Sequence, residues 1–171
     1  GDGFAEGEGA SYNVTGTITN VGKVDNEFTY KLNANTKAGN YEITTTPGEL
    51  EVTPVTDKVT VTITGKTGSF KYDGDVHTVT DYDVAIDNSL YTENDFSFSG
   101  NAAVSGTNVA DSADMGLTAD DFTNTNDNFT NVEFVVNDGS LTITKRSVKL
   151  ISGDGKKVYD GTPLINKTVT V

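Results

Sequence analysis

Phe70-Lys71-Tyr72-Asp73-Gly74 is a short stretch that recurs as Lys157-Val158-Tyr159-Asp160-Gly161, with the tyrosines 159 − 72 = 87 residues apart. Each copy follows a run in which apolar and polar residues alternate, residues 59–63 before the first and 147–150 before the second. In Tyr-Asp-Gly we expect the Asp side chain to bond nearby backbone and the Gly to adopt a positive φ, which predicts a turn and not a catalytic motif. Recurrence at a steady spacing indicates a repeat architecture.

Two further pairs of segments support the repeat. Residues 47–53 correspond to 138–144 with an offset of 139 − 48 = 91, and residues 14–17 correspond to 104–107 with an offset of 106 − 16 = 90. A period near 90 residues is long enough for a small domain. We therefore predict three parts: residues 1–54 as the C-terminal part of one repeat, 55–146 as a complete repeat and 147–171 as the N-terminal part of the next. The alternative phase has domains at 1–86 and 87–171.

The local pattern favours strands. Short apolar-alternating segments are separated by turn residues, and Thr is a frequent strand-favouring filler. The fold class predicted is all-β, with tandem Ig-like antiparallel β-sandwich modules and almost no helix. Thr118 is expected to cap a single helical turn over residues 119–122. Two hairpins are predicted, at the Pro47-Gly48 turn and across residues 132–143 at Asp138-Gly139. The second hairpin should bury Val132, Phe134, Val136, Leu141 and Ile143.

Composition excludes several classes of function. The net charge is −13 and the sequence pI is about 4.2, which is the wrong sign for nucleic acid or an anionic membrane surface. Cysteine is absent, so disulfides and thiolate chemistry are excluded. There is no apolar run of about 18 residues for direct membrane insertion. Any targeting or anchoring signal is expected outside these residues.

No catalytic residue, cofactor site or metal site is predicted. His77 is the single histidine, lacks partners at catalytic or metal spacing, and is interpreted as an exposed strand residue. The segment 111–128 is rich in the hard oxygen ligands that calcium prefers, but its spacing fails the EF-hand template: Phe129 follows Asn124-x-Asn126-x-Asn128 where Gly is required. The candidate calcium ligands are Asp111, Asp114, Asp120, Asp121 and Asp127.

Two further hypotheses concern a cross-link and a binding surface. Lys58 and Asn137 are candidates for an isopeptide cross-link in a cysteine-free β-protein, but the pair is not duplicated in the repeat, and the simpler interpretation is that both are ordinary surface residues. A binding module would show a contiguous exposed aromatic patch, for instance from Tyr82, Tyr91 and Phe96.

The duplicated Tyr-Asp-Gly and the segment from Asp121 to Lys145, ending in Asp-Gly-Ser-Leu-Thr-Ile-Thr-Lys, resemble YDG/MBG-type tandem repeats of bacterial cell-surface adhesins. The resemblance covers essentially the whole chain and rests on short motifs. It implies a non-catalytic structural or stalk module of an extracellular, Gram-positive-like surface protein whose partners are neighbouring repeats. It carries no catalytic residues. The alternative function is an adhesive module that binds a host glycan or protein.

The two ends of the chain correspond to the two halves of one repeat. Residue 171 corresponds to 171 − 87 = 84, and residue 1 to 1 + 90 = 91. We expect head-to-tail strand complementation, in which Val148, Leu150 and Tyr159 pack on Tyr41, Ile43 and Leu50 of a neighbouring chain. The alternative phase predicts instead that they pack on Phe98, Val104 and Phe134 of their own chain.

Overall fold

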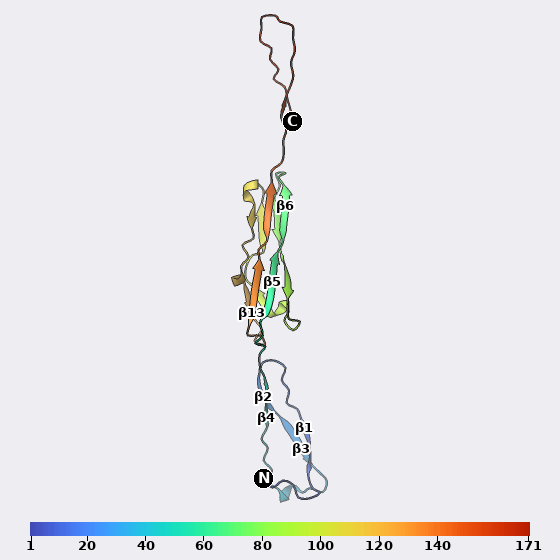
Figure 1. Cartoon of the computed structure of the whole chain (residues 1–171). Coiled ribbons are helices and arrows are strands. Elements are labelled where there is room, and N and C mark those ends of the chain that lie inside the picture. Colours follow the sequence, from blue (N-terminus) through green and yellow to red (C-terminus); the bar gives the residue numbers. More distant parts are fainter. The chain divides into compact units, whose positions relative to one another are not determined.

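A computed structural model describes residues 1–171 and has an all-β fold (Figure 1). The only helices are four 3-10 turns of three residues each, and none is long and apolar enough to cross a membrane. The strands are β1 Ala10–Val14, β2 Gly22–Asn26, β3 Phe28–Leu32, β4 Gly48–Val52, β5 Val59–Gly65, β6 Thr67–Lys71, β7 His77–Thr80, β8 Tyr82–Ile86, β9 Phe96–Phe98, β10 Ala103–Gly106, β11 Ala113–Asp114, β12 Phe122–Asn124, β13 Val132–Asn137, β14 Ser140–Thr144, β15 Ile151–Ser152 and β16 Val169–Thr170. The 3-10 turns are η1 Ala38–Asn40, η2 Glu93–Asp95, η3 Val109–Asp111 and η4 Ala119–Asp121.

The chain forms two compact units. The first contains Gly1–Val61, Ile86–Ser97 and Thr123–Glu133, and the second contains Thr62–Ala85, Phe98–Phe122 and Phe134–Val171. Each unit is therefore built from three separate segments of the sequence. The predicted single helical turn is present, because η4 begins directly after Thr118.

The second unit has its core around the last strand of the predicted complete repeat. β14 lies between β11, which is antiparallel to it, and β6, which is parallel to it. Leu141 and Ile143 of β14 are 1% and 2% exposed and form a cluster with Val79. Phe70, Val104 and Met115 pack against this cluster. The burial predicted for Leu141 and Ile143 is confirmed, whereas Val132, Phe134 and Val136 are only half-buried.

The predicted hairpin across Asp138-Gly139 is wrong. β13 belongs to the sheet β13-β5-β8, whereas β14 belongs to the sheet β11-β14-β6, so the two strands do not pair. The Asp138 carboxylate accepts the backbone N–H groups of Gly116 and Leu117 at 2.8 and 3.1 Å, which holds the chain in a crossing between sheets and not in a tight turn. Parallel pairing also departs from the predicted antiparallel sandwich.

Two glycines allow this crossing. β5 and β6 are likewise in different sheets, and the chain passes between them at Gly65-Lys66. A Cβ atom on Gly65 would collide with the Gly139 backbone, and a Cβ on Gly139 would collide with the Lys66 carbonyl oxygen. The Ser140 N–H donates to that same carbonyl at 3.1 Å. Close approach of two backbones explains why glycine occupies both positions.

The repeated Tyr-Asp-Gly forms the predicted turn in both places. Asp73 Oδ1 accepts the Asp75 N–H at 3.0 Å, and Asp160 Oδ1 accepts the Thr162 N–H at 2.9 Å. Gly74 has φ +97° and Gly161 has φ +75°. Two segments 87 residues apart thus adopt the same side-chain-closed turn.

The first unit contains two antiparallel pairs, β1 with β3 and β2 with β4. The hairpin predicted at the Pro47-Gly48 turn is also wrong, because residues 41–47 form no strand and β4 pairs with β2 instead. The core of this unit consists of Val59 and Val61, both fully buried, with Tyr91 and Phe129 at 2% and 5% exposure. The rings of Tyr91 and Phe129 meet edge to face at 5.1 Å.

The C-terminal segment is largely exposed. β15 and β16 form one short antiparallel pair, and Val148, Leu150 and Tyr159 are 64%, 67% and 92% exposed. The packing of these three side chains on Phe98, Val104 and Phe134 that the alternative phase predicts is therefore absent.

Candidate functional site

Three asparagines of the first unit fold the segment 124–128 through successive side-chain-closed turns. Asn124 Oδ1 accepts the Asn126 N–H at 3.0 Å, and Asn126 Oδ1 accepts the Asn128 N–H at 2.9 Å. The Asn124 amide donates to the Phe129 carbonyl at 2.8 Å. Asparagine is suited to this because its side chain mimics a backbone peptide two residues further on. The alternation Asn-x-Asn-x-Asn is thus explained by local folding.

Asn128 connects this loop to two other parts of the unit. Its Oδ1 accepts the Val21 N–H at 2.7 Å, and its Nδ2 donates to Asn20 Oδ1 at 3.2 Å. Its backbone carbonyl accepts the Val55 N–H at 2.8 Å. We call Asn20, Val21, Val55 and Asn128 the Asn128 joint. It brings together residues separated by up to 108 positions in the sequence.

The Val55 side of the joint continues as a short parallel bridge. Val55 pairs with Phe129, and the Thr130 N–H donates to the Val55 carbonyl at 3.1 Å. The Asn131 amide donates to the Thr56 carbonyl at 3.2 Å. The segment around Pro54, predicted to link two repeats, is therefore hydrogen-bonded on both backbone groups of Val55. A free linker would leave these groups to water.

Asp95 and Tyr91 both form hydrogen bonds to the loop 124–128. The Asn126 amide donates to Asp95 Oδ1 at 2.7 Å, and Asp95 Oδ2 accepts the Thr92 N–H and hydroxyl. Burial acts to raise the pKa of Asp95, but these hydrogen bonds outweigh it and lower that pKa. The Tyr91 hydroxyl lies 2.9 Å from both the Asp95 carbonyl oxygen and Asn124 Oδ1. Burial raises the pKa of Tyr91 to about 12.

A cleft of about 280 Å³ adjoins the joint. It is lined by Asn20, Val21, Asn94, Asp95, Thr125, Asn126, Asp127 and Asn128. Its lining holds amides, one threonine and the carboxylates of Asp95 and Asp127. The side-chain amides of Asn126 and Asn128 bond to other side chains and to the backbone, so they fasten segments of the chain together.

The five candidate calcium ligands do not form a metal site. Asp111 accepts the backbone N–H groups of Asn108 and Thr107, which lowers the pKa of Asp111, and Asp121 accepts the Thr118 N–H. Asp114, Asp120 and Asp127 are exposed. No three His, Cys, Asp or Glu side chains lie close enough together to hold a metal ion.

His77 is half-buried, which corrects its interpretation as an exposed residue. Its ring stacks on Phe70 with centroids 4.3 Å apart, and its Nε2 lies 3.0 Å from Asp73 Oδ1. The Asp75 N–H, followed by the His77 side chain, lowers the pKa of Asp73. His77 thus braces the Tyr-Asp-Gly turn.

The structure also places the residues of the isopeptide and aromatic-patch hypotheses. The Lys58 ammonium pairs with the Glu133 carboxylate, and Asn137 is an exposed residue at the end of β13. The aromatic patch proposed for a binding module does not form, because Tyr91 is buried and Tyr82 and Phe96 are half-buried. Tyr82 packs edge-on against Phe98 and Phe122.

Sequence reasoning missed the Asn128 joint, although a signal for it exists. Asn20-Val21 follows Val-Thr-Gly-Thr after two further residues, and Asn108-Val109 follows Val-Ser-Gly-Thr directly. The same dipeptide also occurs at 13–14 and 131–132, so its recurrence at 20–21 and 108–109 is a weak signal. The partner of Asn20-Val21 is more than 100 residues away, so no local pattern predicts the contact.

Comparison of the chain with models of known protein families, with curated proteins and with solved structures found no match.

Proposed function

We propose that this chain is a non-catalytic stalk segment of an extracellular, adhesin-like surface protein, built from tandem repeats of the YDG/MBG type. Its role in this proposal is to space and support other parts of the protein under tension. The function requires that each repeat resist pulling at its ends and that neighbouring repeats be joined firmly.

The observation that carries the proposal is the parallel pairing of strands near the start and end of the predicted repeat 55–146. β6 pairs with β14 in parallel, from Thr67↔Ser140 to Lys71↔Thr144. At the start of the repeat, Val55 pairs in parallel with Phe129. When the first and last strands of a module are parallel neighbours, pulling its termini apart shears all ladder hydrogen bonds together instead of opening them one by one. Such a geometry suits a module that carries force.

The Asn128 joint supports the second requirement. It fastens Asn20 and Val21 of the predicted first repeat, and the linker residue Val55, to the loop of the following repeat. The corresponding dipeptide Asn108-Val109 lines a cleft of about 430 Å³ in the second unit, together with Tyr72, Lys145, Arg146 and Val148. Val109 is 38% exposed there. In the proposal this cleft receives the Asn-rich loop of a following repeat.

The alternative, an adhesive module for a host glycan or protein, has weaker support. The most exposed aromatic side chain of the first unit is Tyr12, at 62%, and Val14, two residues further on, is 60% exposed. Val104, the residue that corresponds to Val14, packs against the core of the second unit. The exposure in the first unit is therefore better explained by an incompletely covered core than by a ligand site.

Single-molecule pulling on the full chain between its two ends tests the proposal. We expect one cooperative, high-force unfolding event from residues 55–146. Thr142→Pro removes a backbone donor from β14 and should lower that force, whereas Thr142→Ala at the same exposed position should leave it nearly unchanged. Gradual extension at low force in the unmodified chain would overturn the stalk proposal.

A further inference from the structure

One edge of β4 has no partner strand. β4 corresponds to β14 with an offset of 91 residues, and β14 is paired on both sides, by β11 and by β6. β4 is paired only by β2, which occupies the place of β11. The side that β6 covers on β14 is therefore uncovered on β4. An unpaired strand edge is a template for addition of a strand from another chain.

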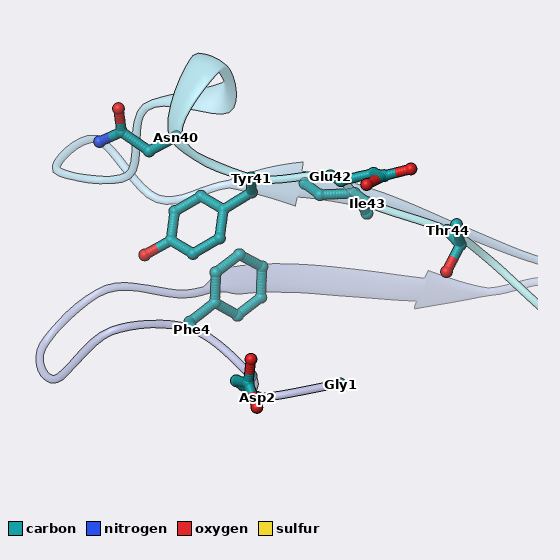
Figure 2. A pocket seen from close by; sticks show the side chains of 9 residues that line it. Gly1, Asp2, Phe4, Asn40, Tyr41, Glu42, Ile43 and Thr44 are labelled. Carbon is teal, nitrogen blue, oxygen red and sulfur yellow. The ribbon is translucent and has the colours of Figure 1, made fainter.

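A second strand is missing beside residues 41–46. These residues correspond to β13, which is the neighbour of β5 and runs in the same direction in Figure 1. Residues 41–46 form no strand and instead border a cleft of about 560 Å³, lined by residues 40–44 and 1–4. Figure 2 shows Ile43 and Tyr41 along one side of this cleft and Phe4 on the other. The Phe4 and Tyr41 rings meet edge to face at 5.1 Å, which covers only part of the apolar surface.

The chain carries the counterparts of both missing strands near its C-terminus. With an offset of 87 residues, Val148 and Leu150 correspond to Val61 and Ile63 of β5. Val61 and Ile63 are fully buried, whereas Val148 and Leu150 are 64% and 67% exposed. Residues 154–158 correspond likewise to β6. The apolar side chains that fill the core in the complete repeat are thus present but uncovered in this segment.

Charge favours the same pairing. Residues 147–171 contain four lysines and two aspartates, a net charge of 4 − 2 = +2 in a chain of net charge −13. Residues 1–54 contain three lysines and eight acidic residues, a net charge of 3 − 8 = −5. Opposite signs attract the two segments, whereas most other surfaces of the chain repel one another.

We propose that residues 147–158 of one molecule add as strands to residues 41–52 of a second copy of this chain. The register follows from the complete repeat, where the Val59 N–H donates to the Asn131 carbonyl at 2.9 Å. Carried over by the two offsets, this bond becomes Arg146 N–H to the Asn40 carbonyl and places Val148 beside Ile43. Residues 154–158 then lie parallel to residues 49–53. The contact is head to tail, so in a pair of molecules one segment 147–158 and one segment 41–52 are still unpaired and can bind further copies.

The inference rests on the tandem-repeat part of the proposed function, and not on mechanical resistance. Pulling on residues 55–146 tests force resistance within one molecule, whereas the complementation is read from molecular mass. A chain that resists force but stays monomeric would overturn only the complementation, and a chain that associates but extends at low force would overturn only the stalk role.

Light scattering during size-exclusion chromatography of the full chain measures the association. We expect the average mass to rise with concentration for the unmodified chain. Val148→Asp and Ile43→Asp, each alone, should be monomeric at every concentration. A mixture of the two should form a dimer and nothing larger, because each variant keeps one intact partner segment. Leu90→Asp, at a position 74% exposed outside both segments, is the matched control and should associate like the unmodified chain.

Disulfide cross-linking tests the same contact without the aspartate substitutions, which could disturb folding. The chain has no cysteine, so Ile43→Cys and Val148→Cys introduce the only thiols. Mixing these two chains under oxidising conditions should give a covalent dimer in high yield, whereas Ile43→Cys mixed with Leu90→Cys should give several-fold less. A monomeric unmodified chain, equal cross-linking of both mixtures, or an intramolecular disulfide in the double variant Ile43→Cys/Val148→Cys would overturn the proposal.

Discussion

The side-chain oxygen of Asn128 accepts the backbone N–H of Val21 at 2.7 Å, across 107 residues of sequence. The same asparagine accepts the Val55 N–H through its backbone carbonyl. One residue thus holds the first predicted repeat by its side chain and the linker by its main chain.

Asn128→Ala separates these two roles. The variant loses the acceptor for Val21 and the donor to Asn20, so we expect the local stability of the joint to fall by about 1–2 kcal/mol. Hydrogen exchange should show faster exchange at Val21, with a smaller effect at Val55, whose acceptor is the main chain. Asn128→Asp retains the acceptor and should protect Val21 better than Asn128→Ala. Equal exchange of Val21 in all three chains would contradict the assignment.

The close approach of Gly65 and Gly139 predicts that alanine destabilises the chain at position 139 but not at the corresponding position 48 of the first repeat. Gly139→Ala places a methyl group against the Lys66 carbonyl oxygen and the Met115 sulfur, so we expect a loss of about 2 kcal/mol or more in the free energy of unfolding. Gly48→Ala is the matched control, since Gly48 is the corresponding residue of the first repeat and a Cβ there meets no atom within 4 Å. Denaturant unfolding of both variants makes the comparison. Equal losses would show that the close approach is not the cause.

The sequence predicted the strand content and the repeated turn but not the strand pairing. Alternation located Phe28–Leu32 and the buried Leu141 and Ile143, because the side-chain period of a strand is local. Asp-Gly at 138–139 predicts a hairpin turn. In the structure the same dipeptide instead lies where the chain passes from one sheet to another, beside the backbone of Gly65, which is more than 70 residues away in sequence. Turn chemistry does not distinguish these two uses.

The candidate site was equally beyond local prediction. The alternation of Asn124, Asn126 and Asn128 partly resembles a calcium-binding loop, since asparagine oxygens are suitable ligands. Their oxygens instead accept backbone N–H groups within the loop and from Val21. The recurrence of Asn-Val at 20–21 and 108–109 does not identify the partner, because the same dipeptide also occurs at 13–14 and 131–132.

Calcium is expected to leave the melting temperature of the chain essentially unchanged. The Asp111 and Asp121 carboxylates already accept backbone N–H groups, and no three acidic side chains converge. Thermal unfolding with calcium and with a chelator measures this. A large upward shift with calcium that Asp121→Ala abolishes would contradict it, because a bound ligand stabilises by mass action.

Tyr91 predicts a specific loss of stability at alkaline pH. Its pKa is about 12 in the folded chain against about 10 for an unperturbed tyrosine. A raised pKa means that the stabilisation is fully present below pH 10 and is lost as the pH rises through 12. Tyr91→Phe should be less stable by about 1 kcal/mol at neutral pH, through the lost hydroxyl hydrogen bond. Denaturant unfolding at increasing pH should show a shallower alkaline decline in the variant, and parallel declines would contradict the prediction.

A spin-label distance measurement across the Asn128 joint tests the central claim, that successive repeats are firmly joined, most directly. Lys31→Cys and Ser89→Cys provide two exposed labelling sites in the first unit of a chain without other cysteines. The account predicts a narrow distance distribution that Asn128→Ala broadens and that Asn108→Ala, at the corresponding dipeptide of the second unit, leaves unchanged. A broad distribution in the chain with an intact Asn128 would contradict it.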